Sequence, residues 1–199
     1  MKVIGFNGSP RKGANTETLV KAVLKGAAGK GAETRLVNLN ELSIKGCQGC
    51  DACKNDLGTC VQKDDISPLL QEMKECDAIV LGTPIYWFHV SSQFKALIDR
   101  FYCFFGWEPD PDTGELKEIT TFPKDKKFVI VTSRGDEENT KVLPQLYGYI
   151  HEWLNIIAAA MRSSSTEIIN HYGSWNLKDS ALNDSDLIAR AESVGASLV

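Results

Sequence analysis

The sequence lacks a long hydrophobic run. No stretch of its 199 residues approaches the roughly 18 apolar residues of a membrane-spanning helix. Met1 and Lys2 lead directly into a polar loop at Asn7, so we expect no apolar signal-peptide core. Positive charge is not in excess either, and the net charge of −4 provides no general attraction to nucleic acid or to an anionic membrane. These absences predict a cytoplasmic protein that has neither a membrane nor a nucleic acid as its partner.

Two nucleotide-binding fingerprints are also missing. Gly8 and Gly13 have the spacing of a GxxxxG phosphate loop, but Ala14 and Asn15 stand where an NTPase has Lys and Ser or Thr. Without that lysine and that hydroxyl, the γ-phosphate and Mg²⁺ have no ligands, which argues against an NTPase. The GxGxxG fingerprint is absent here as well, which argues against a permanently bound NAD in the Rossmann manner.

The composition is that of a globular protein, with 43% hydrophobic and 24% charged residues. The chain is long enough to bury a full core in one domain. No Ser-, Gly- or Pro-rich linker, internal repeat or low-complexity tract divides it. We therefore expect a single domain over residues 1–199.

Short apolar runs alternate with longer amphipathic ones along the chain, which predicts an α/β fold. The expected strands are Lys2–Asn7, Thr34–Leu39, Ala78–Thr83, Lys127–Thr132 and Thr166–Asn170. The expected helices are Asn15–Gly29, Asp65–Cys76, Val90–Phe101, Thr140–Ala160 and Ser180–Ser197. This order predicts a parallel sheet with helices on both faces and right-handed crossovers. A cysteine-rich loop at 46–63 and an excursion at 104–126 fall outside the pattern.

The loop after the first strand, in "FNGSPRKGANTETL", is a candidate anion site, since such sheets bind ligands beyond the carboxyl ends of their strands. Gly8 and Ser9 allow a close turn, and Asn15 or Thr16 is expected to cap the next helix and leave its free amides facing an anion. Arg11 adds a forked cation suited to phosphate. The alternative interpretation is a capped glycine turn in which the arginine is merely solvated.

The two following loops have less specific patterns. In "GTPIYWFHVSSQFKALIDR", Pro84 predicts a turn directly after the third strand, and the aromatic residues Tyr86, Trp87 and Phe88 follow it. Such a run is typical of a core or a subunit interface as well as of a ligand wall. The loop "TSRGDEENT" supplies hydroxyls, backbone donors and Arg134.

Four of the six cysteines are closely spaced, in the pattern C-x2-C-x2-C-x6-C: Cys47, Cys50, Cys53 and Cys60. The compact first three resemble a ferredoxin-type run more than a zinc ribbon. From the residues alone, an iron–sulfur site, a zinc site, a redox dithiol pair and plain reduced thiols all remain open. Cys76 and Cys103 are expected to be small buried residues.

Together, "GSPRKGANTETL", "GTPIYWFHVSSQFKALIDR" and "GCQGCDACKNDLGTCVQKDDI" resemble the flavodoxin-like NADPH-dependent FMN reductase family, and in particular its iron–sulfur flavoprotein branch. The resemblance covers about the first 135 residues. It implies a flavodoxin-like three-layer sandwich whose five-stranded parallel sheet has the order 2-1-3-4-5, with FMN at the point where the strand order reverses.

The resemblance also implies which residues bind the flavin. Around the FMN phosphate it places Ser9, Arg11, Asn15 and Thr16. Along the isoalloxazine ring it places Thr83, Pro84, Ile85, Tyr86 and Trp87, and on the far side Thr132, Ser133 and Gly135. It implies no catalytic side chain, because the flavin itself accepts and donates the electrons.

By the same resemblance, the four clustered cysteines bind a [4Fe–4S] cluster. Electrons come from NAD(P)H or a ferredoxin and pass to a quinone, a flavin or another small acceptor, in a homodimer or homotetramer. The sequence leaves a second hypothesis from another class open. This is a non-catalytic flavodoxin-fold module, with a zinc-binding or thiol loop and an aromatic surface for a protein partner.

Overall fold

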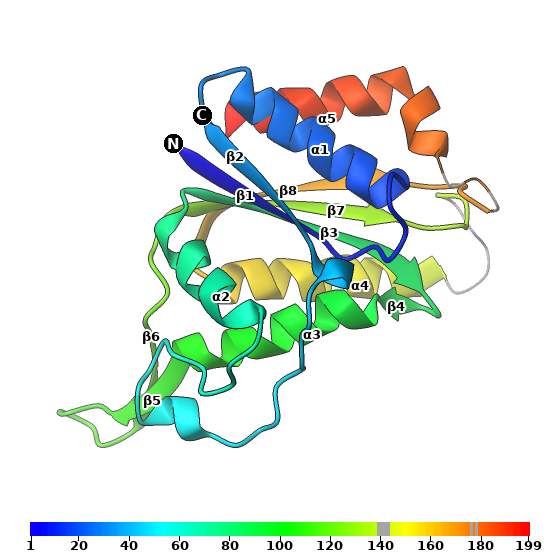
Figure 1. The fold of residues 1–199 in the computed structure, drawn as a ribbon. Coiled ribbons are helices and arrows are strands. Elements are labelled where there is room, and N and C mark those ends of the chain that lie inside the picture. Colours follow the sequence, from blue (N-terminus) through cyan, green and yellow to red (C-terminus); the bar gives the residue numbers. More distant parts are fainter. Residues whose placement is uncertain (139–143, 176, 178) are drawn as a thin grey trace.

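A five-stranded parallel sheet forms the centre of the molecule (Figure 1). The computed structural model describes residues 1–138, 144–175, 177 and 179–199. The strands, in their order across the sheet, are β2 (Glu33–Asn38), β1 (Lys2–Asn7), β3 (Ala78–Tyr86), β7 (Lys126–Ser133) and β8 (Ser163–His171). All neighbouring pairs are parallel. This confirms the predicted α/β class and the flavodoxin-like order 2-1-3-4-5.

Helices cover both faces of the sheet, as predicted. One face carries α1 (Asn15–Ala28) and α5 (Ser185–Ser197). The other carries α2 (Ile66–Glu75), α3 (Ser92–Arg100) and α4 (Pro144–Ala160). The predicted first residues of the fourth helix, from Thr140, lie outside the described residues. No helix among those described is long and apolar enough to cross a membrane.

The two middle strands are buried on both sides, which explains their continuous apolar sequences. In β3 and β7, the side chains of Ile79 and Ile130 pack into the core beneath α2, α3 and α4. Val80 and Val131 pack into the core beneath α1 and α5. Because alternate side chains point to opposite faces, each strand contributes to both cores.

Helices α1 and α5 pack with their backbones in close contact. A Cβ atom added to Gly26 would lie 1.9 Å from the carbonyl oxygen of Glu192, and one added to Gly195 would lie 1.9 Å from that of Val23. Real side chains do not tolerate such distances. The two glycines are therefore required by the helix pair and not by any turn.

Three short strands depart from the predicted pattern. β4 (His89–Val90) folds back on the end of β3 as an antiparallel partner. The excursion at 104–126 contains a separate antiparallel hairpin of β5 (Phe105–Pro109) and β6 (Leu116–Thr120), which projects at the lower left of Figure 1. Both pairings are antiparallel and join strands that are consecutive in the sequence with no helix between them, so the βα rhythm does not indicate them.

The predicted continuous helix Ser180–Ser197 is wrong. A 3-10 turn spans Ser180–Asn183, and α5 begins separately at Ser185. The Asp184 carboxylate accepts a hydrogen bond from the Leu187 amide at 2.9 Å. A capping aspartate satisfies a free amide at the start of a helix, so it marks a boundary here.

The close contact between α1 and α5 predicts that a glycine-to-alanine substitution changes the free energy of unfolding in opposite directions at two positions. Gly195→Ala should lower the free energy of unfolding by about 1–3 kcal/mol, the usual cost of overpacking. Gly148→Ala in α4 is the matched control, because nothing lies within 4 Å of the added carbon; it should raise stability by about 0.5–1 kcal/mol through helix propensity. Urea denaturation measures both, and equal stability of the two variants would contradict the described packing.

Candidate functional site

A cavity of about 860 Å³ opens at the carboxyl edge of the sheet. Loops after β1, β3 and β7 line it, so it lies where the strand order reverses. Most of the predicted cofactor-binding residues meet there: Ser9, Arg11, Asn15, Thr16, Pro84, Ile85, Tyr86, Trp87, Ser133 and Gly135. Residues that are far apart in the sequence thus share one site, as parallel topology requires.

The turn after β1 is held by its own short polar contacts. The Ser9 amide donates to Asn7 Oδ1 at 3.0 Å, and the Arg11 amide donates to Ser9 Oγ at 3.2 Å. Gly8 contacts the neighbouring strand directly, because its amide donates to the Gly82 carbonyl at 2.8 Å. The Arg11 guanidinium lies 5.9 Å from the centre of the Tyr86 ring. The turn is therefore built before any ligand arrives.

The predicted capping role of Asn15 or Thr16 is wrong. The residue before the helix is Ala14, and no side chain caps α1. Asn15 instead crosses to the C-terminal segment, where its side-chain amide donates to the Leu177 carbonyl at 3.0 Å and its oxygen accepts from the Ala181 amide at 2.9 Å. Sequence reasoning could not find these partners, which lie more than 160 positions away. Among the described residues, no side chain accepts a hydrogen bond from the first amides of α1.

Two of the predicted residues lie behind the cavity wall. Thr83 is buried, and its hydroxyl accepts from the Ser91 amide at 3.1 Å. Thr132 donates to Asn170 Oδ1 at 2.6 Å. Both side chains support the edge of the sheet and do not line the cavity.

The predicted turn at Pro84 is also wrong, because β3 continues to Tyr86. Pairing of β3 with β1 ends at Gly82, so the missing amide of Pro84 costs no hydrogen bond on that side. The reversal comes three residues later, at Trp87 and Phe88, between the paired residues Tyr86 and His89.

The turn at Trp87 and Phe88 has an unusual backbone. Their φ angles are +44° and +67°, and a two-residue hairpin turn with positive φ at both positions ordinarily carries Asn-Gly. Bulky residues in this region cost on the order of 1–3 kcal/mol each. Trp87 is 91% exposed and lines the cavity. The chain thus places aromatic surface at the mouth of the site where a relaxed turn would have none.

Arg134 is a second cavity residue whose role the sequence does not reveal. Only 5% of it is exposed, and its guanidinium carbon lies 3.4 Å from the ring centre of Tyr147 and 4.5 Å from that of Tyr172. Nη2 donates to the carbonyls of Glu137 and Glu138. The buried Nε has no hydrogen-bond partner among the described residues. A buried donor without a partner is costly, and Arg134 lines the cavity, so this donor is available to a ligand that binds there.

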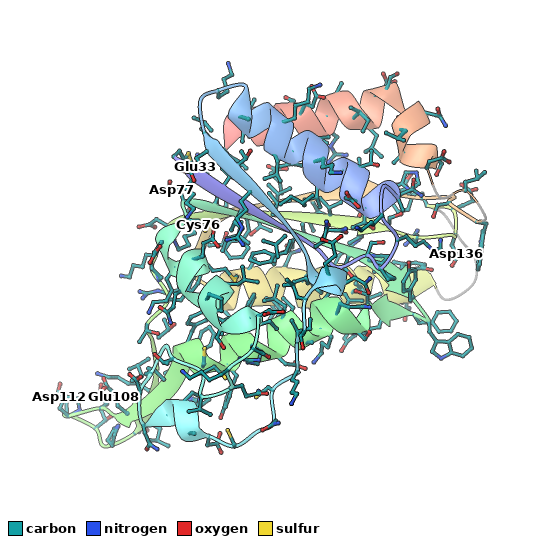
Figure 2. The ribbon with its side chains drawn as sticks, in the orientation of Figure 1. Glu33, Cys76, Asp77, Glu108, Asp112 and Asp136 are labelled. Carbon is teal, nitrogen blue, oxygen red and sulfur yellow. The ribbon has the colours of Figure 1, made fainter. Side chains whose placement is uncertain are left out.

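Asp136 and Tyr147 form a polar pair on the same wall. Figure 2 shows Asp136 at the carboxyl edge of the sheet, opposite the edge where Glu33 and Asp77 lie. The Tyr147 hydroxyl donates to Asp136 Oδ2, and burial together with this bond raises the pKa of Tyr147 to about 12. The phenol is therefore protonated at neutral pH and serves as a hydrogen-bond donor.

Trp175 also lines the cavity. It is 69% exposed, and a Cβ atom added to Gly135 would lie 2.8 Å from its ring, so the glycine allows the indole to rest on the loop after β7. Ser174 fixes the approach, because its amide and hydroxyl both donate to the Arg134 carbonyl. The contact depends on a residue some 40 positions downstream, which explains why no local pattern indicates it.

The four clustered cysteines meet at a second place. The segment that carries them, drawn in cyan, runs below α3 in Figure 1. Cys47, Cys50, Cys53 and Cys60 all line one small space of about 10 Å³. Within the described residues, no three His, Cys, Asp or Glu side chains stand close enough together to hold a metal ion. Burial raises the pKa of the Cys53 thiol, so its neutral form is favoured in this arrangement.

The other two cysteines are buried, as predicted. Burial raises the pKa of Cys76 to about 11 and that of Cys103 to about 12. Both therefore remain thiols at neutral pH and behave as small apolar residues.

A doubly wound parallel sheet with a cavity at its strand-order reversal defines a flavodoxin-like protein. The chain belongs to the NADPH-dependent FMN reductase family, whose model matches residues 1–157, and within it to the iron–sulfur flavoprotein branch. An iron–sulfur flavoprotein of Methanosarcina thermophila is 38% identical over 178 residues, which are 88% of this chain and 83% of that protein.

Other relatives match over a shorter range. An iron–sulfur flavoprotein of Methanocaldococcus jannaschii is 45% identical over 100 residues, and the match spans about half of each chain, 50% of this one and 51% of the relative. Solved structures share the fold at low identity. An NAD(P)H:quinone oxidoreductase of Methanothermobacter marburgensis has a TM-score of 0.80 at 15% identity. The superposition covers 100% of this chain and 99% of that protein. An FMN-dependent NADH-azoreductase of Bacillus anthracis in complex with FMN has a TM-score of 0.73 at 14% identity, with 99% and 98% coverage.

The strained turn predicts that stability and ligand binding respond in opposite directions. Replacing Trp87 and Phe88 together by Asn and Gly should raise the free energy of unfolding by about 1–3 kcal/mol, because the turn then relaxes. The same change should weaken FMN binding, because the aromatic surface is lost.

Trp87→Ala separates the two effects. It removes the indole but keeps a side-chain carbon at positive φ, so it should weaken FMN binding without the gain in stability. Denaturant unfolding of the flavin-free protein and flavin titration measure the two quantities. A double variant that is less stable than the parent would show that the turn is not strained.

Proposed function

We propose that the chain is an FMN-dependent oxidoreductase that accepts electrons from NAD(P)H and passes them to a quinone, a flavin or another small acceptor. The observation that carries this proposal is the cavity at the sheet edge, where a positively charged turn and an aromatic turn face one space. The family is described as NADPH-dependent FMN reductases, and the similar proteins include an iron–sulfur flavoprotein and an NAD(P)H:quinone oxidoreductase, which supports the proposal. FMN, when bound, supplies the hydride and electron transfer.

The turn after β1 suits the FMN phosphate. Arg11 offers a forked cation, Ser9 a hydroxyl, and the first turn of α1 amides that no side chain caps. The Glu17 carboxylate, which would repel a phosphate, is occupied by other partners. It accepts a hydrogen bond from the Gly13 amide at 2.8 Å and forms an ion pair with Lys21. Arg11, Ser9 and the first amides of α1 would bind the phosphate dianion and determine how deeply the ligand enters the cavity.

The rest of the cavity suits a flat ring. Ile85, Tyr86 and Trp87 form an aromatic and apolar wall on one side, which would orient the isoalloxazine and exclude water from it. Arg134 also lines the cavity, and its Nε, which has no partner within residues 1–138, 144–175, 177 and 179–199, offers a donor to a ring oxygen or nitrogen. Positive charge there would stabilise electron density that the ring gains on reduction.

We also propose that Cys47, Cys50, Cys53 and Cys60 bind a [4Fe–4S] cluster, which would carry single electrons. The four thiols are the right donors for iron, and they converge on one space. That space is about the size of one water molecule, so the loop has to open to admit a cluster. Gly49 and Gly58, whose φ angles are +63° and +99°, provide conformational freedom on either side of Cys53.

The exposed aromatic turn also supports assembly into a homodimer or homotetramer. A 91% exposed tryptophan at the mouth of the cavity gains most if a second subunit covers it. Sedimentation of the FMN-loaded protein tests this part of the proposal. A ferredoxin remains an alternative electron donor to NAD(P)H.

Anaerobic purification followed by a visible spectrum and analysis of the released flavin tests the proposed function. We expect one FMN per chain. Without oxygen, NADH or NADPH should reduce the flavin and bleach its visible absorbance, and a quinone should reoxidise it and restore that absorbance. A colourless protein with stoichiometric zinc would overturn the proposal and favour the non-catalytic module.

Arg11 provides a specific test of the phosphate turn. Arg11→Ala should weaken FMN binding by roughly 10- to 150-fold, the equivalent of losing a charged hydrogen bond worth about 1.5–3 kcal/mol. Riboflavin binding should change little. Lys12→Ala is the matched control, because Lys12 pairs with Glu41 at 2.7 Å on the surface and does not line the cavity. Equal FMN affinity in the parent and Arg11→Ala would remove Arg11 from the site.

Cys53 provides the corresponding test of the cluster. Anaerobic protein should contain about four iron and four sulfide per chain, as a cubane requires. Cys53→Ser should lose the brown absorbance and keep FMN, because the flavin cavity is built from other loops. Cys103→Ala is the control, since this buried thiol lines the same space but is not a proposed ligand. Iron-free but fully flavinated wild-type protein, even after reconstitution, would refute the cluster.

A further inference from the structure

Arg100, the last residue of α3, is the most completely buried charge next to the cysteine segment. Only 1% of it is exposed, although arginine is almost never fully buried unless it is paired. Its position is on the side of α3 that faces the segment, which runs below that helix in Figure 1. Neither the flavin cavity nor the proposed cysteine ligands account for it.

The partners of Arg100 come from both ends of the cysteine segment. Nη1 donates to the Lys45 carbonyl at 3.1 Å and to Asp64 Oδ2 at 2.7 Å, and Nη2 donates to the Gln62 carbonyl at 3.4 Å. Nε donates to Cys60 Sγ at 3.2 Å. One guanidinium thus joins the chain that enters the loop to the chain that leaves it.

Other bonds close the same neck, which we define as residues 43–46 and 62–65. The Lys45 amide donates to Asp64 Oδ2 at 3.1 Å, and Gln62 Nε2 donates to the Gly46 carbonyl at 3.1 Å. The Ser43 amide donates to Asp65 Oδ2 at 2.7 Å. The neck is therefore a fixed structure, whereas much of the loop between is exposed.

We infer that Arg100 is the positioning residue of the cysteine site: it closes the neck of the loop and holds the Cys60 sulfur by a charged N–H···S hydrogen bond. Closing the neck keeps Cys47 and Cys60, the first and last of the four, near each other before any iron binds. This lowers the entropy that the loop loses when four thiolates gather around one centre. The inference rests on the proposed cluster for its functional meaning, but not for its geometry.

The sulfur bond has a second consequence. Hydrogen bonds to the sulfurs of iron–sulfur sites contribute to their reduction potentials, because they favour the more negative, reduced state. The guanidinium charge is paired with the Asp64 carboxylate at 2.7 Å, so the N–H···S hydrogen bond carries this effect. Arg100 should therefore raise the reduction potential of a cluster that Cys60 binds.

The test compares Arg100→Met with the double variant Arg100→Met, Asp64→Asn. The single change leaves the buried Asp64 carboxylate without its cation, and the double change removes both charges. If Arg100 served only to neutralise Asp64, the double variant would recover wild-type iron binding. We expect both variants to bind FMN normally and to lose iron at chelator concentrations about 10-fold or more below the wild-type value.

Arg100→Lys keeps the charge but cannot reproduce the fork. We expect it to retain a cluster whose midpoint potential is lower than that of wild type. Two results would overturn the inference. One is an Arg100→Lys variant whose midpoint potential and iron retention both equal those of wild type, and the other is recovery of wild-type iron binding in the double variant. If Arg100→Met does not fold, the double variant and Arg100→Lys still decide.

Hydrogen exchange on iron-free, FMN-loaded protein distinguishes failure of this inference from failure of the proposed cluster. Amides of the neck should exchange faster in Arg100→Met and in the double variant than in wild type, with those of β1 and β3 unchanged. Unchanged exchange in the neck would overturn the inference whatever the iron content. If the wild-type protein never takes up iron, but the neck amides exchange faster in the variants, the proposed cluster is refuted and the inference about the neck stands.

Discussion

Burial of β1, β3 and β7 between two helical layers is the constraint on which the rest of the structure depends. These strands are apolar on both faces, so they occupy the centre of the sheet and end at one edge. That edge brings together the polar turn at residues 7–16, the aromatic turn at 84–88 and the loop at 133–136. Packing thus determines where chemistry can occur, and the loops determine which chemistry.

The fold was largely predictable from the sequence, because its strong periodicities are local. The strand order followed from the family resemblance, and the central strands agree with the structure within a few residues. Of the candidate site, the loops that line the cavity were predictable. The Asn15 contact with Leu177, the burial of Arg134 between two tyrosines and the indole over Gly135 were not, because each joins residues from distant elements. The positive φ of Trp87 contradicts the preferences of its own residue type.

The two candidate centres are built on different principles. The flavin cavity is open and largely preformed; in the part of the chain that the structure describes, Arg134 Nε has no acceptor and the first amides of α1 have no side-chain cap. The cysteine site is contracted, but its neck is held by Arg100 and Asp64. An open cavity admits a ligand that binds without rearrangement, whereas a closed loop with a fixed neck suits a centre that is assembled once and retained.

The most direct test of the central claim is hydrogen exchange of the flavin-free protein with and without FMN, at saturating ligand. The account predicts protection of the first amides of α1, the turn at 84–88 and the loop at 133–136, with the cysteine segment unchanged. Protection confined to other parts of the chain, or none at all, would contradict an FMN site at the carboxyl edge of the sheet.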